Sequence, residues 1–139
     1  MSPVIDRLGE LYRHLEHLRE LRPRVTGPKI LREDLSLGND VLRSLQIVCQ
    51  VVIDIASELS ARRKLRFASN SEAVENLSAM PEFPSTIARD LEGLPGFRNV
   101  LIHEYVALNY TLVVDALDRL DVVEKFAEIV RGLELTAED

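Results

Sequence analysis

Apolar residues recur at helical spacing along most of the chain. Ser2 and Pro3 have the form of an N-cap and a first helical residue, and leucines then repeat every three or four positions until Pro23. The segment RPRVTGPK, residues 22–29, contains two prolines and a glycine and predicts a connector. This pattern predicts a first helix that ends near residue 22.

The longest periodic segment runs from about residue 34 to residue 64. Its main apolar stripe consists of Val41, Leu45, Val48, Val52, Ile55 and Leu59, with Leu42, Cys49, Ile53 and Ala56 beside it. A single surface helix needs a narrower apolar face than this. The segment therefore predicts a central helix that is covered from more than one side.

Shorter helices are predicted in the second half of the chain. Ser69 and Glu72 form a capping-box pattern that opens a short helix to residue 80, where the prolines of MPEFP end it. A second short helix, 85–92, stops at Gly93, and LPGF then connects to a segment over 97–107. Asn109 caps one last helix through Val130.

Together these segments predict an all-α fold, an up-and-down bundle of about four main helices plus short helices. The chain contains no pair of strand-like segments joined by a hairpin turn. At 139 residues, 1–139 is expected to be a single domain.

The bulk composition excludes several functions. A net charge of −6 and a pI of about 5.1 argue against coating nucleic acid through bulk charge, so any RNA contact has to be local.

Cys49, the single cysteine, lies in an apolar segment and is expected to be a buried thiol. The charged N-terminus and the lack of an apolar stretch of ~20 residues predict a cytoplasmic protein with no membrane contact.

The nonapeptide FRNVLIHEY, residues 97–105, is where the sequence points to chemistry. On a helix, Asn99 and His103 share a face, and Arg98 lies about 100° from Asn99. Arginine offers a fixed fork of donors to phosphate oxygens, and histidine exchanges a proton near neutral pH. From the residues alone, two interpretations remain open: a phosphate-directed site, or polar residues on an ordinary half-exposed helix.

Arg98, four residues, His103, one residue and then Tyr105 match the R-x4-H-x-Y signature of the HEPN superfamily, in the form found in HepT-like toxins. These toxins belong to toxin–antitoxin pairs with a minimal nucleotidyltransferase. The resemblance extends to LPGF before the arginine, to QIVCQVVIDIASEL as the long second helix, and to the closing helix. It therefore covers nearly the whole chain.

The resemblance implies a metal-independent endoribonuclease toxin that needs no cofactor and acts as a homodimer on RNA. By position, Arg98 would stabilise charge on the phosphorane, and His103 would move the proton of the attacking 2′-hydroxyl or of the leaving oxygen. Asn99 would orient the phosphate or the imidazole. Tyr105 would be the residue to which a cognate nucleotidyltransferase antitoxin transfers AMP.

One residue departs from the family pattern. Glu104 stands between His103 and Tyr105, where the family often has glycine. A carboxylate there can repel RNA or bias the protonation of the histidine. The alternative function is therefore a non-cleaving HEPN subunit that binds a nucleotide or a partner nucleotidyltransferase.

Three other features have structural as well as functional interpretations. ARRKLR, residues 61–66, is either a solvated helix end or an RNA contact. His14 and His17 have the spacing of metal ligands, but no further His or Cys accompanies them, so a surface helix without a metal is expected. Asp54, within VVIDIA, requires a cationic neighbour, and a contact to Arg98 is a further option.

Overall fold

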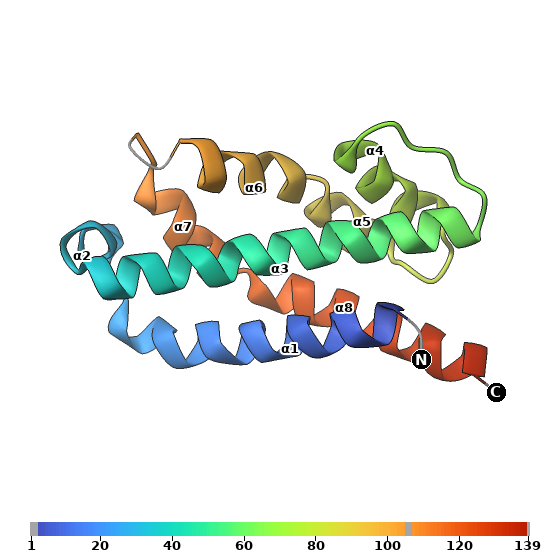
Figure 1. Ribbon diagram of the computed structural model, residues 1–139, viewed down its shortest axis with the longest axis horizontal. Helices are drawn as coiled ribbons and strands as arrows, with labels where there is room; N and C mark the ends of the chain where they lie inside the picture. Colours follow the sequence, from blue (N-terminus) through green and yellow to red (C-terminus); the bar gives the residue numbers. More distant parts are fainter. Residues whose placement is uncertain (1–2, 105–106, 139) are drawn as a thin grey trace.

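The computed structural model describes residues 3–104 and 107–138, and these ranges are all-α, as the sequence predicts (Figure 1). In chain order the helices are α1 (Pro3–Leu21), α2 (Pro28–Glu33), α3 (Leu35–Arg62), α4 (Asn70–Glu75), α5 (Ser85–Leu91), α6 (Leu94–His103), α7 (Tyr110–Leu117) and α8 (Leu120–Glu138). Two 3₁₀ turns, Arg22–Arg24 and Asn76–Ala79, follow α1 and α4.

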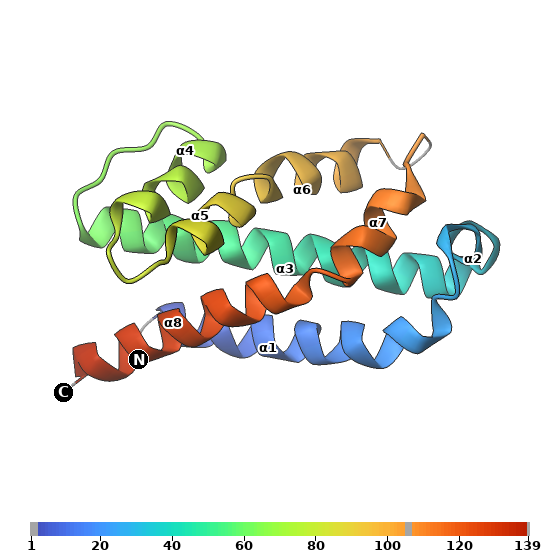
Figure 2. The same ribbon diagram turned by 180° about the vertical axis from the view of Figure 1, so that it is seen from behind.

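Helix α3 runs the length of the molecule, and the other long helices lie along it (Figure 1). α1, α3, α6 and α8 alternate in direction, which is the predicted up-and-down arrangement (Figure 2). α1 packs against both α3 and α8, while α6 packs against α3. α2 covers the beginning of α3, and α4 covers its end.

The predicted apolar face of α3 is buried. The buried residues include Val41, Leu45, Val48, Cys49, Val52, Ile53, Ile55, Ala56 and Leu59. By length and composition alone α3 would be long and apolar enough to cross a membrane, but 61% of its most apolar window is buried inside the bundle. That burial is typical of the core helix of a soluble bundle, and it explains why this face is so wide.

Three helix caps are present, and the sequence predicts two of them, at Ser69 and Asn109. The Asp34 carboxylate accepts a hydrogen bond from the backbone N–H of Leu37 at 3.1 Å and opens α3. The Ser69 hydroxyl accepts from the N–H of Glu72 at 3.1 Å, while the Glu72 carboxylate reaches back to the N–H of residue 68. Asn109 caps α7 through the N–H of residue 111. Each cap satisfies a backbone donor that the first helical turn leaves unpaired.

The prediction of one last helix from Asn109 through Val130 is wrong, because the chain breaks between α7 and α8. At the end of α7 the backbone N–H of Asp118 donates to the oxygens of both Val114 and Asp115. The N–H of residue 119 donates to the oxygen three residues earlier, so the α-helical hydrogen-bond pattern ends there. The Asp118 carboxylate binds Arg22 at 2.8 Å. α7 packs on α2, whereas α8 packs on α1 and α5. The two halves of the predicted helix therefore pack against different neighbours.

Other predicted boundaries shift for local reasons. The expected connector 22–29 contains a 3₁₀ turn and the first residues of α2, a helix the pattern did not predict. LPGF is the first turn of α6, because proline is well tolerated at the start of a helix. α6 ends at His103 instead of residue 107, and the helix after Ser69 becomes a 3₁₀ turn beyond Glu75.

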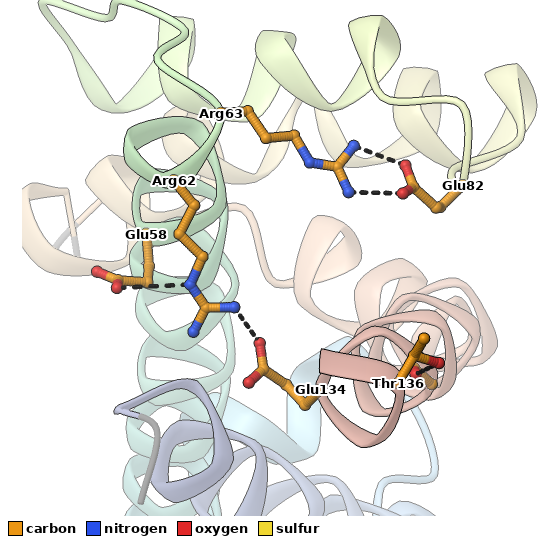
Figure 3. A network of polar contacts seen from close by, with 7 residues as sticks. Glu58, Arg62, Arg63, Glu82, Glu134 and Thr136 are labelled. Atoms are coloured by element: carbon orange, nitrogen blue, oxygen red, sulfur yellow. Dashed lines mark hydrogen bonds and ion pairs between the residues drawn. The ribbon is translucent and has the colours of Figure 1, made fainter. Parts of the chain in front are cut away.

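The end of α3 is tied to α8 by a buried ion pair (Figure 3). Glu134 is only 3% exposed, and its carboxylate accepts a hydrogen bond from Arg62, which also lies 3.8 Å from Glu58. Arg63 binds Glu82 through two hydrogen bonds of 2.6 Å each. Residues 61–66 therefore form a helix end, as one of the two interpretations states, and two of its four cations are neutralised by carboxylates.

Gly38 sets the distance between α2 and α3. A Cβ atom at this position would lie 2.0 Å from the backbone oxygen of Leu31, which cannot rotate away as a side chain would. Leu31 is itself buried, so α2 would have to expose this side chain to move away from α3. The close approach of the two helices thus requires glycine at this position.

We expect Gly38→Ala to lower the free energy of unfolding by about 1–3 kcal/mol, the usual range for overpacking. Gly9→Ala on α1 is the matched control, since nothing lies within 4 Å of its Cβ position, and there the better helix propensity of alanine should stabilise the protein by up to about 1 kcal/mol. Urea unfolding followed by circular dichroism measures both. A Gly38→Ala protein as stable as the parent would show that α2 is not fixed by this contact.

Candidate functional site

Helix α6 carries the motif and is fastened to α3. Leu101 is buried against the core, and the side-chain amide of Gln46 on α3 donates a hydrogen bond to the Leu101 backbone oxygen at 3.3 Å. Phe97 and Val100 are half-buried on the same side of the helix. These contacts fix which face of α6 points outward.

Asn99 and His103 lie on the exposed face of α6, four residues apart on one helix, as predicted. Arg98 is half-buried at the side, and its Nη1 donates a hydrogen bond to Asn99 Oδ1 at 3.1 Å. Asn99 therefore holds the guanidinium of its neighbour by a neutral contact, which leaves the positive charge uncompensated.

The Arg98 guanidinium is incompletely satisfied. Its Nε is buried, and in the part of the chain that the structure describes it has no hydrogen-bond partner. No carboxylate within residues 3–104 and 107–138 pairs with Arg98, in contrast to Arg7, Arg19 and Arg22. A buried donor without a partner costs about 1–3 kcal/mol, so the arrangement favours a ligand that accepts hydrogen bonds and carries negative charge.

Cys49 lies beneath this arginine and is the buried thiol that the sequence predicts. Burial raises the pKa of Cys49 to about 12 because it disfavours the thiolate, while the positive charge of Arg98 works in the opposite direction. The thiol thus stays protonated at neutral pH. It does not provide a counter-ion for Arg98.

The helix ends directly after the histidine. His103 is the last residue of α6, the N–H of Glu104 bonds to the Val100 oxygen at 3.0 Å, and both side chains are exposed. Glu104 therefore stands in solvent next to His103. Tyr105, the expected AMP acceptor, lies outside the described residues.

Arg98 and His103 do not share a face of α6. They are five residues apart, which corresponds to about 140° around the axis of a regular helix. One copy of α6 consequently presents the guanidinium and the imidazole in different directions.

Asp54 has the cationic neighbour that its position requires. Its carboxylate accepts hydrogen bonds from Arg7 on α1 at 2.9 Å and from Gln50 at 2.8 Å. Both carboxylate oxygens are engaged in this way, at the interface of α1 and α3. Asp54 therefore has a structural role, and Arg98 is not among its partners in these contacts.

His14 and His17 join α1 to α3. His17 Nε2 lies 2.8 Å from Asp40 Oδ1, and His14 Nδ1 lies 3.2 Å from Ser44 Oγ. Among the described residues, no group of three or more His, Cys, Asp or Glu side chains is placed to hold a metal ion. The two histidines act as polar links across a helix interface, whose partners on α3 the sequence pattern did not indicate.

An apolar cavity of about 270 Å³ lies on the other side of α6. Its lining includes Cys49, Leu91, Phe97 and Leu112, and so combines α3, α5, α6 and α7. The sequence pattern gave no sign of this cavity, because its walls come from helices far apart in the chain.

The chain is similar to known proteins over nearly its whole length. It is 27% identical over 136 residues to the mRNA nuclease HepT of Shewanella oneidensis, a match that covers 93% of this chain and 96% of the relative. Two solved structures have the same fold. One, the tri-AMPylated Shewanella oneidensis HEPN toxin in complex with MNT antitoxin, has a TM-score of 0.81 and 21% identity, covering 95% of this chain and 99% of that one.

The second is a tyrosine-to-alanine mutant of the toxin–antitoxin MntA-HpeT, with a TM-score of 0.83 and 20% identity, covering 94% of this chain and 99% of that chain. The family model of HepT-like ribonucleases matches residues 11–130, a range that contains α3, α6 and the Arg98–Tyr105 motif. The chain belongs to the HepT-like ribonuclease family and has the HEPN fold.

Proposed function

We propose that this protein is a metal-independent endoribonuclease toxin of a type VII-like toxin–antitoxin system, which acts in the cytoplasm as a homodimer. The observation that carries the proposal is the half-buried Arg98, whose Nε has no partner among the described residues, on the same helix as the exposed His103. The family match and the nuclease name of the relative support RNA as the substrate.

In the proposed reaction, the substrate supplies its own nucleophile. The neutral imidazole of one His103 takes the proton of a 2′-hydroxyl, whose oxygen attacks the neighbouring phosphorus. The P–O5′ bond breaks, and the 5′-oxygen leaves with a proton from an imidazolium, which returns the site to its starting charge. Arg98 binds the non-bridging oxygens as their charge grows, and Asn99 keeps the guanidinium in place.

A second copy of the chain completes the site in this proposal. Arg98 and His103 of one α6 point about 140° apart, so a single helix does not clasp a phosphate between them. A two-fold axis beside α6 would bring the arginine of one protomer opposite the histidine of the other. It would also double the local positive charge of a protein whose net charge is −6.

One observation favours the second candidate, a HEPN subunit that binds a nucleotide or a nucleotidyltransferase and does not cut RNA. Glu104 is exposed next to His103, where its charge opposes an approaching phosphate. The antitoxin complexes of the structural relatives are compatible with both functions. An RNA cleavage assay separates the two.

We expect the purified protein to cleave RNA in the presence of EDTA and to leave 2′,3′-cyclic phosphate ends. His103→Ala should remove the activity, and Arg98→Ala should reduce it about 10²-fold or more, the usual effect of losing a donor to a developing anion. Arg131→Ala on α8 is the matched control for loss of one exposed arginine. Product ends are identified by mass spectrometry. Loss of cleavage on chelation would refute the mechanism, and no cleavage by the parent would favour the second candidate.

We expect a homodimer at micromolar concentration, because the site needs two copies of α6. Small-angle X-ray scattering gives the mass of the particle in solution. Mixed dimers of Arg98→Ala and His103→Ala protomers provide the sharper experiment: each mutant alone lacks both copies of one group, whereas the mixture retains one intact pair. Recovery of part of the activity on mixing supports a shared site, and a monomeric parent protein contradicts it.

We expect Tyr105 to be the residue that a cognate nucleotidyltransferase antitoxin modifies. Attack of its hydroxyl on the α-phosphate of ATP would form Tyr–AMP and release pyrophosphate, and the added phosphate would engage Arg98 and displace RNA. Coexpression followed by intact-mass measurement and peptide mapping locates the AMP, with Tyr12 and Tyr110 as internal controls. AMP on either control tyrosine, or full neutralisation of Tyr105→Phe by the antitoxin, would exclude this switch.

A further inference from the structure

Arg32 on α2 lies over an aromatic ring that belongs to α7. Its guanidinium carbon is 5.1 Å from the centroid of the Tyr110 ring. Tyr110 is half-buried at the first position of α7, and α2 and α7 pack against each other. Arg32 itself is exposed. The ring therefore supports one side of the guanidinium and leaves the other side open to solvent.

The charge of Arg32 is not neutralised by a neighbouring carboxylate in the described part of the chain. On α2, the carboxylate of Glu33 lies 3.7 Å from Lys29, one turn earlier, which is its ion-pair partner. The contact of Arg32 to Tyr110 is with a neutral ring. An arginine held by a ring keeps its full charge and its planar surface, and the contact restricts the side chain to fewer rotamers.

This pair lies toward the end of α6 that carries His103, whereas Arg98 lies farther back along α6, near Cys49 in the middle of α3. α6 ends at His103 and α7 begins at Tyr110, so six residues lie between the two along the chain. Figures 1 and 2 show α2, the end of α6 and the start of α7 gathered at one end of α3. A strand of RNA that is bound at His103 and runs along this end of the molecule would reach Arg32.

We propose that Arg32, supported by Tyr110, is a nucleobase-stacking subsite for single-stranded RNA, beyond the end of α6 that carries His103. Nucleobases stack on guanidinium planes and on aromatic rings, and every base offers a flat face for this contact. The subsite would hold a base of the bound strand outside the site of cleavage. The inference rests on the proposed function, because it takes RNA as the molecule that reaches this end of the protein.

The experiment measures binding without cleavage. His103→Ala provides the background, and fluorescence anisotropy gives the Kd of a short single-stranded RNA. Arg32→Ala should weaken binding about tenfold, a typical effect of losing one stacked base. Arg32→Lys keeps the charge but lacks the plane, and it should weaken binding nearly as much. Tyr110→Leu should act in the same direction, and Tyr110→Phe, which restores the ring, should recover the affinity.

Two controls separate stacking from charge and from fold stability. Lys29→Ala removes an exposed cation from the same helix and should change the Kd about twofold at most. An oligonucleotide of the same length with abasic sites should bind the Arg32 and Arg32→Ala proteins nearly equally. Urea unfolding of each variant shows whether α2 stays docked on α7.

Full affinity in Arg32→Lys, or an equal loss with the abasic oligonucleotide, would identify a phosphate contact and overturn the stacking subsite. Unchanged RNA binding in Arg32→Ala, with lower stability, would mean that the pair only joins α2 to α7. A parent chain that binds RNA through Arg32 but cleaves none would refute the proposed nuclease while the subsite stands. A chain that cleaves RNA with no contribution from Arg32 would refute the subsite while the proposed nuclease stands.

Discussion

The burial of α3 on several sides is the constraint on which the rest of the structure depends. Its apolar face is too wide for one neighbour, and α1, α2, α4 and α6 pack against it. Removing this much apolar surface from water is the main favourable term for a domain of this size. Individual residues of α3 then fix the position of the neighbouring helices. Asp54 binds Arg7 of α1, Gln46 binds the backbone of α6, and Gly38 admits α2. The helices around the site are thus positioned by one element.

The candidate site contains a charged, partly buried side chain, unlike the apolar core around it. α6 could have buried an apolar residue where Arg98 lies, yet the structure places a guanidinium beside the protonated thiol of Cys49 and leaves its Nε without a partner in the described residues. Other arginines of this acidic protein are neutralised by carboxylates, but within residues 3–104 and 107–138 no carboxylate pairs with Arg98. The free-energy cost of this unpaired buried donor is offset where a ligand supplies the missing acceptor. A phosphate has both the negative charge and the hydrogen-bond geometry that a guanidinium requires.

Helical geometry also limits what one copy of the motif does. The motif spacing places Arg98 and His103 on different sides of α6, and the helix ends at His103, so that no further turn brings them together. The exposed end of α6 lies at the same end of α3 as α2 and the start of α7, where Arg32 lies over Tyr110 (Figure 1). Local positive charge at this end contrasts with the net charge of −6. In the proposed function, recognition of RNA therefore depends on a few placed cations and on shape instead of bulk charge.

The sequence by itself determined the helices with strong periodicity or clear caps, because those signals are local: the length and buried face of α3, the caps at Ser69 and Asn109, and the nonapeptide that marks the family. It also predicted the shared face of Asn99 and His103 and the ionic partner that Asp54 requires. Only the tertiary structure decided the break at Asp118, the formation of α2, the identity of Arg7 as that partner, and the contact of Arg32 with Tyr110. Each of these joins residues far apart in the chain, and no periodic pattern encodes which distant helix will be the neighbour.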